Sequence, residues 1–125
     1  MSAETVDIAL RRAGSADEGT IRRWLVAPHV ARRTYRLFSD IVERLGDVLR
    51  DPQAGLYVAE LGDRPIGLVH VYRAHGDQRW AGVADVTERT RAIDFLIGAT
   101  DMVNKKLGRR MLGALAVQVF RDPDI

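Results

Sequence analysis

The chain has 125 residues, of which 46% are hydrophobic, so it is long and apolar enough to form one domain with a buried core. It contains no cysteine, which excludes disulfides and cysteine-ligated zinc, and its three histidines, His29, His70 and His75, lack metal-ligand spacing, so we expect no metal site. The formal net charge of +2 is small, and acidic residues are spread among the basic ones, which argues against nucleic acid as the partner.

The first predicted elements are a strand and a helix. Residues 8–13 alternate weakly between apolar and polar side chains, which favours a strand. Ser15 is a good helix cap, and the helix that follows it is expected to end before Pro28. Its apolar residues predict an inward face made of Ile21, Trp24 and Leu25.

Residues 34–50 predict a second, amphipathic helix, which ends at Asp51 and Pro52. Its apolar residues recur at spacings of three and four: Phe38, Ile41, Val42, Leu45 and Leu49. Two strand-like runs follow at 55–61 and 66–72. Turn-forming residues separate these runs, so they most simply form an antiparallel hairpin.

The polar segment 73–89 predicts a long surface loop, a common place for binding residues. Residues 91–97 then alternate in a way that suits a strand covered on both faces. Residues 107–120 carry apolar side chains at helical spacing.

A basic turn lies between this last strand and the last helix. Its charges are Lys105, Lys106, Arg109 and Arg110. The first N–H groups of a helix have no partner within the helix, so together with these charges they attract an anion, and the flanking strand and helix favour a phosphate over a merely solvated helix start.

Four stretches of the chain follow one another in a characteristic order. They are residues 24–30, where a tryptophan precedes a Pro-His pair, residues 62–67, residues 91–97, and residues 104–108 together with 120–123. They resemble the Gcn5-related N-acetyltransferase (GNAT) family, in particular its branch of aminoglycoside N-acetyltransferases and siderophore-type acyltransferases. The resemblance implies an α/β (α+β) fold with a mostly antiparallel sheet of about four strands, two helices after the first strand and one after the fourth.

The resemblance further implies an acyl-CoA-dependent N-acyltransferase, with acetyl-CoA as co-substrate and a primary amine of a small molecule as acceptor. Asp94 lies where the aminoglycoside-type enzymes have an aspartate proposed to take the proton from the substrate ammonium. The implied cofactor-binding groups are the backbone amides of the strand and the basic turn: Phe95, Leu96, Ile97, Asn104, Lys105, Lys106, Leu107, Gly108, Arg109 and Arg110.

Tyr72, Trp80 and Asp85 are candidate acceptor-binding residues. Tyr72 shares a predicted strand face with His70, and Trp80 is an aromatic residue in a polar loop, where it can stack on a ligand. Related aminoglycoside enzymes carry several clustered carboxylates in this loop, whereas residues 80–88 hold only two, which favours a less cationic amine.

These residues also have simpler explanations. Asp94 is equally well explained as a strand aspartate that pairs with Arg91 or lies exposed on a sheet edge. Tyr72 and His70 are more often packing residues than ligands, and a tryptophan such as Trp80 can simply cover the edge of a core.

The chain departs from the family pattern in two places. Asn104 and Lys106 stand where the phosphate-binding turn normally has glycines, and only Gly108 remains. The family would also continue beyond Ile125 into a fifth strand, so we expect a single domain over 1–125 that is incomplete at its carboxyl end.

An incomplete sheet would leave an apolar edge at residues 95–98, which predicts a homodimer or a partner subunit that covers it. The alternative function is a catalytically silent acetyltransferase-like protein that binds a partner through this edge. The polar amino terminus and the absence of a membrane-spanning run lead us to expect a cytoplasmic protein without membrane contact.

Overall fold

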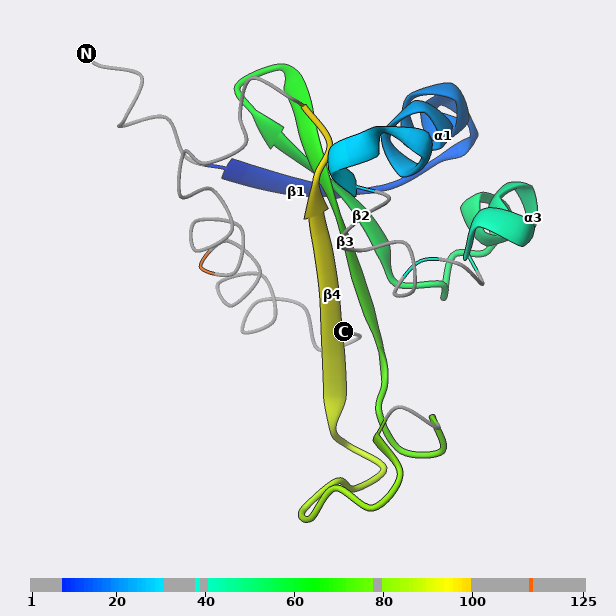
Figure 1. The fold of residues 1–125 in the computed structure, drawn as a ribbon, viewed down its shortest axis with the longest axis vertical. Coiled ribbons are helices and arrows are strands. Elements are labelled where there is room, and N and C mark those ends of the chain that lie inside the picture. Colours follow the sequence, from blue (N-terminus) through cyan, green and yellow to red (C-terminus); the bar gives the residue numbers. More distant parts are fainter. Residues whose placement is uncertain (1–7, 31–37, 39–40, 78–79, 100–112, 114–125) are drawn as a thin grey trace.

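A computed structural model describes residues 8–30, 38, 41–77, 80–99 and 113 of the chain (Figure 1). Four strands form one antiparallel sheet in the order β1-β2-β3-β4: β1 Ile8–Arg12, β2 Leu56–Leu61, β3 Arg64–Arg73 and β4 Arg91–Ile97. The predicted fold class, a mixed α/β fold with an antiparallel sheet of four strands, is confirmed. The helix expected after the fourth strand falls outside the described residues, apart from position 113.

The helices α1 Glu18–Val26 and α3 Leu45–Arg50 lie on one face of the sheet (Figure 1). Their apolar side chains pack on alternate residues of the strands and form the helix-side core: Ile21, Trp24, Leu25, Val30, Phe38, Ile41, Leu45, Leu49, Leu56, Val58, Leu68 and Leu96. The predicted inward face of the first helix is therefore confirmed. A smaller apolar cluster, which includes Tyr57, Val69 and Val71, lies on the opposite face.

The first helical segment begins differently from the prediction. A 3-10 helix, η2 Ser15–Asp17, precedes α1, and its cap residue is Gly14 rather than Ser15. The Asp17 carboxylate accepts a hydrogen bond from the Gly14 N–H at 2.9 Å and two from the Arg11 guanidinium, both at 2.8 Å. The Arg11 bonds, helped by the Gly14 N–H, hold the pKa of Asp17 below its ordinary value of 3.8.

The prediction of one continuous helix over 34–50 is wrong at Arg44. This residue has φ −121° and ψ 25°, so α3 starts only at Leu45. Gly46, a poor helix former, is the second residue of α3. The apolar periodicity survives because both sides of the break still turn the same residues inward, and Ile41, Leu45 and Leu49 are all buried.

Both hairpins of the sheet are antiparallel. β2 and β3 are joined by a two-residue turn, Gly62 and Asp63, shorter than the four residues expected, and Gly62 adopts φ 64°. β3 and β4 pair without a break from Gly67 opposite Ile97 to Arg73 opposite Arg91, and Figure 1 shows them running together beyond the helices into a loop. The predicted hairpin and the predicted loop are thus confirmed.

β4 occupies an edge of the described sheet, because its only partner there is β3. Ala92, Asp94 and Leu96 are buried, whereas Phe95 and Ile97 are half-buried and Ile93 is 39% exposed. The expectation that both faces of this strand are fully covered is therefore wrong within the described residues. Of the side chains of β4, only those that point toward the helix-side core are fully buried.

Candidate active site

Asp94 is buried in the middle of β4, with 7% of its surface exposed. Among the described residues no other charged side chain is so deeply buried. It lies on the same strand face as Leu96, which belongs to the helix-side core. The interpretation of Asp94 as an exposed edge residue is therefore wrong, and because burying a carboxylate is costly, its position calls for polar neighbours.

Those polar neighbours come from β3 and the loop after it. His70 is the cross-strand partner of Asp94, so both side chains leave the same face of the sheet at adjacent positions. The His70 ring stacks on Tyr72, with centroids 5.1 Å apart and planes 24° apart. The indole N–H of Trp80 donates to the Tyr72 hydroxyl at 3.0 Å. A connected polar column thus runs from the loop to Asp94.

The free edge of β4 presents its own polar groups. The N–H groups of Gly98 and Ala74 bond to carbonyls across the β3–β4 pair, and bonding positions alternate along an antiparallel ladder. The register therefore turns the amides of Leu96 and Asp94 toward β3. The amides of Phe95 and Ile97 point outward, where a ligand can reach them.

His29 joins the end of α1 to the end of β4. Its Nε2 lies 3.0 Å from the Ile97 carbonyl oxygen, and because a carbonyl only accepts, Nε2 carries the proton in this bond. The contact also confirms that the Ile97 carbonyl points to the outer edge. In the sequence, His29 stands out only as part of a Pro-His pair, and nothing local signals a bond to a residue 68 positions away.

Trp24 fixes the same corner by packing. It is buried in the helix-side core, as expected, and its ring lies directly against Gly98. A Cβ at Gly98 would overlap the ring, so only glycine lets the helix approach the strand end this closely. Trp24 and His29 together set where the last residues of β4 lie.

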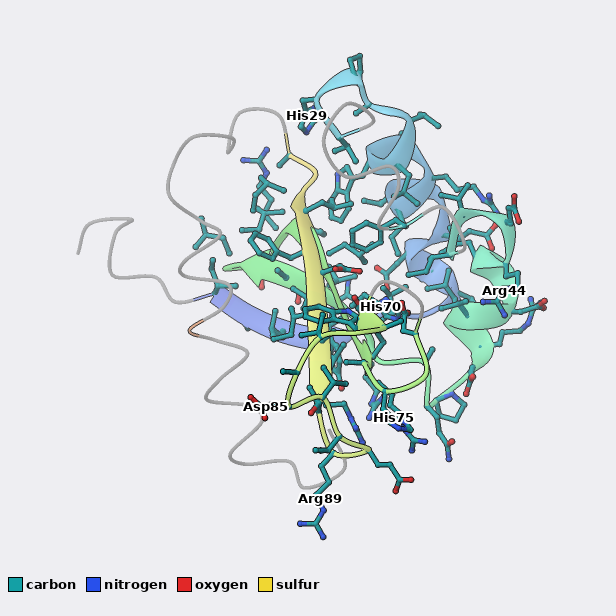
Figure 2. All side chains as sticks on the ribbon, turned by 60° about the horizontal axis from the view of Figure 1, so that its bottom comes forward. His29, Arg44, His70, His75, Asp85 and Arg89 are labelled. Carbon is teal, nitrogen blue, oxygen red and sulfur yellow. The ribbon has the colours of Figure 1, made fainter. Side chains whose placement is uncertain are left out.

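The remaining predicted site residues lie apart from this cluster or outside the described residues. Asp85 is exposed in the loop, with φ 67°, and Figure 2 shows its carboxylate pointing outward. Among the described residues, no hydrogen bond or ion pair joins Asp85 to the bonded pair of Tyr72 and Trp80. The whole basic turn lies outside the described residues: Asn104, Lys105, Lys106, Leu107, Gly108, Arg109 and Arg110.

Two further observations bear on the kind of site. Within the described ranges, no group of three or more His, Cys, Asp or Glu side chains is arranged to hold a metal ion. No helix in that same part of the chain is long and apolar enough to cross a membrane.

Comparison with protein families gives one match over most of the chain. The model of the family described as acetyltransferase (GNAT) domain matches residues 14–125.

Individual proteins and solved structures point the same way. The chain is 30% identical over 129 aligned residues to aminoglycoside N(6′)-acetyltransferase type 1 of Klebsiella pneumoniae and, equally, of Serratia marcescens. The alignment covers 94% of this chain but only 62% of the length of each relative.

Among solved structures, AAC(6′)-Ib in complex with ribostamycin and coenzyme A is 27% identical with a TM-score of 0.66, covering 95% of this chain and 70% of the other. An uncharacterized protein from Bacillus halodurans has a TM-score of 0.75 at 23% identity, covering 94% and 61%, which shows a shared fold.

Proposed function

Because this chain belongs to the GNAT acetyltransferase domain family, we propose that it transfers an acetyl group from acetyl-CoA to a primary amine of a small molecule. The similar proteins are aminoglycoside N(6′)-acetyltransferases, and their solved structures hold coenzyme A or acetyl-CoA, which supports this reaction class. The observation that carries the proposal is the buried Asp94, joined through His70 to Tyr72 and Trp80.

Asp94 is the general base in this proposal. A primary amine is an ammonium ion near neutral pH, and it must lose a proton before its nitrogen can attack the thioester carbonyl. Asp94 accepts that proton, directly or through one water, and a positioned base of this kind contributes roughly 100-fold or more to the rate. The new C–N bond then forms, the C–S bond breaks, and the leaving thiolate takes up a proton.

The co-substrate is proposed to lie along the free edge of β4. The outward amides of Phe95 and Ile97 can bond an extended amide-containing arm, much as an added strand would. The Leu96 amide is assigned to the β3 ladder instead of to the ligand. The phosphates are proposed to bind the basic turn over residues 104–110, on the strength of its sequence.

The acceptor is proposed to be a small amine with fewer positive charges than an aminoglycoside. Residues 80–90 contain only two carboxylates, Asp85 and Glu88, and both are exposed. Tyr72, which stacks on the cross-strand partner of Asp94, and Trp80, which bonds Tyr72, offer aromatic surfaces. The second wall of the acceptor cleft is proposed to come from another copy of the chain or a partner subunit packed against the β4 edge.

The test combines binding and turnover. Acetyl-CoA should raise the melting temperature of the wild-type chain, because a ligand that binds only the folded state stabilises it. Asp94→Asn should keep that shift but lower kcat by about 100-fold or more in a screen of small primary amines. Asp63→Asn, in the exposed hairpin turn, is the matched control and should change neither quantity.

Two outcomes would contradict the proposal. If acetyl-CoA leaves the melting temperature unchanged, the chain does not use this co-substrate. If acetyl-CoA binds but Asp94→Asn acetylates at the wild-type rate, Asp94 is not the base. If acetyl-CoA binds but the wild-type chain acetylates none of the amines, the chain is better explained as a binding protein.

A further inference from the structure

An open cavity of about 680 Å3 lies at the end of the sheet where β4 begins. Its wall is formed by the end of β1, the start of β2, the end of β3, the start of β4 and the segment 52–55 before β2. Three arginines, Arg12, Arg73 and Arg91, line it together with Tyr57 and Tyr72. The proposed acetyl-transfer chemistry uses none of these arginines.

The strand register places all three arginines on one face of the sheet. Arg12 is opposite Tyr57 in the β1–β2 pair, and Tyr57 is opposite Val69 in the β2–β3 pair. Arg73 follows Val69 by an even number of residues and is itself opposite Arg91. This is the face of the smaller apolar cluster, the reverse of the face that holds Asp94.

The Arg73–Arg91 pair is unfavourable by itself. Like charges directly opposite each other on neighbouring antiparallel strands repel, and this cross-strand pair ends the β3–β4 ladder. Among the described residues that line the cavity there is no aspartate or glutamate to offset the repulsion.

Two of the three guanidinium groups are held in place by backbone carbonyls and not by carboxylates. Arg12 donates from Nη1 to the Pro52 carbonyl at 2.6 Å and lies 5.5 Å above the Tyr57 ring centre. Arg91 donates from Nη1 to the Glu88 carbonyl at 3.2 Å. These contacts orient the groups while leaving their full positive charge for a ligand.

We propose that this cavity binds a small polyanion, either a phosphate ester or a polycarboxylate. The planar fork of arginine matches both carboxylate and phosphate oxygens, and three such forks around one cavity suit a ligand with at least two negative charges. The site goes beyond acetyl transfer. It adjoins the Asp94 column through Tyr72, which lines the cavity and also stacks on His70.

Two probes distinguish a phosphate ester from a polycarboxylate as the ligand of this cavity. Pyrophosphate and tricarballylate are titrated by calorimetry into the whole chain at low salt, and at least one of them binds with an affinity that falls as salt is added. Tighter binding of pyrophosphate assigns a phosphate ester, and tighter binding of tricarballylate assigns a polycarboxylate. Binding of neither probe overturns the proposal.

Arg73→Glu is the decisive variant, because it moves binding and stability in opposite directions. It replaces a repulsive cross-strand pair by an attractive one, so the melting temperature rises or stays level, while the affinity for the probe falls by at least about tenfold. Arg50→Glu, an exposed arginine outside the cavity, is the matched control and leaves probe affinity unchanged. Unchanged probe binding in Arg73→Glu overturns the site.

A last comparison separates this site from the proposed co-substrate site. The Arg73→Glu variant retains wild-type affinity for acetyl-CoA, whereas a Lys106→Glu, Arg110→Glu double variant loses acetyl-CoA affinity and retains the probe. If Arg73→Glu weakens acetyl-CoA instead, the cavity belongs to the co-substrate, and a separate polyanion site is overturned.

Discussion

Arg11 and Arg12 are consecutive residues of β1, but their side chains leave opposite faces of the sheet. On the helix-covered face, Arg11 is bonded twice to Asp17 and lies 3.1 Å from Glu60. On the opposite face, Arg12 contacts a backbone carbonyl and a tyrosine ring at the wall of a cavity. The same side chain is therefore part of the scaffold on one face and available to a ligand on the other.

The difference extends to the rest of the two faces. The helix-covered face holds the larger core, the polar column at Asp94 and the close contact of Trp24 with Gly98. The opposite face holds a smaller buried apolar cluster and, at one end, the arginine-lined cavity. Stability should thus depend more on the helix-covered face, and changes to the exposed arginines of the cavity should affect binding more than folding.

The largest expected effect comes from Gly98→Ala, which breaks the packing of the helix-covered face. The added methyl group would overlap the Trp24 ring, so helix and strand must separate, at a cost of about 3 kcal/mol in the free energy of unfolding. Urea denaturation measures this cost. Gly19→Ala, in α1 where only the flexible Arg23 side chain is near, should instead leave stability unchanged or raise it slightly. Equal stability of the two variants would mean that Trp24 does not pack on Gly98.

Asp17→Ala should have the next largest effect. It removes the carboxylate that bonds the Gly14 N–H at the start of η2 and the charge-assisted bonds from Arg11, a loss of about 2 kcal/mol. The pKa of Asp17 is lowered in the folded chain, so its contribution is complete above the ordinary value of 3.8 and is lost as pH falls through the lowered pKa.

The stability gap between wild type and Asp17→Ala should therefore be constant near neutral pH and narrow below pH 3.8. Urea titrations at a series of pH values measure this gap. A gap that stays constant into acid would show that the carboxylate charge plays no part.

The smallest expected effects on stability come from replacing Arg11 and Arg12, the two arginines on opposite faces of β1. Arg11→Ala should cost about 1 kcal/mol, since its ion pairs are partly exposed and screened. Arg12→Ala should cost no more than about 0.5 kcal/mol, because one carbonyl contact and an exposed cation–π contact are weak. Thermal unfolding of both variants in one buffer measures the contrast, and a larger loss for Arg12 would reverse the assignment of the two faces.

The predictions of individual strands and helices are confirmed where residues close together in the sequence decide the local structure. The bounds of β4 match the predicted strand over residues 91–97, and the hairpin of β2 and β3 forms where turn residues were seen. The buried face of α1 follows from its spacing of apolar residues. In each case the periodicity of a strand or helix fixes which side chains point together.

The predictions from the sequence are wrong where the local structure depends on contacts with residues far away in the sequence. Ser15 is a good capping residue, but Arg11 from β1 holds the Asp17 carboxylate where it bonds the Gly14 N–H, and η2 is capped at Gly14 instead. The helix break at Arg44 leaves the apolar spacing intact, so periodicity could not reveal it. The exposure of Asp85 likewise depends on how the loop folds back on itself.

The sequence by itself indicated the family through the order of its motifs, and the resemblance implied the antiparallel sheet and Asp94 as the candidate base, while periodicity along the chain placed the individual strands and the inward face of the first helix. Only the tertiary structure decided that Asp94 is buried opposite His70, that His29 reaches the Ile97 carbonyl, and that Arg73 lies opposite Arg91. The physical reason is that strand register and helix docking are set by packing across the whole sheet. A shift of one residue would move each of these side chains to the other face.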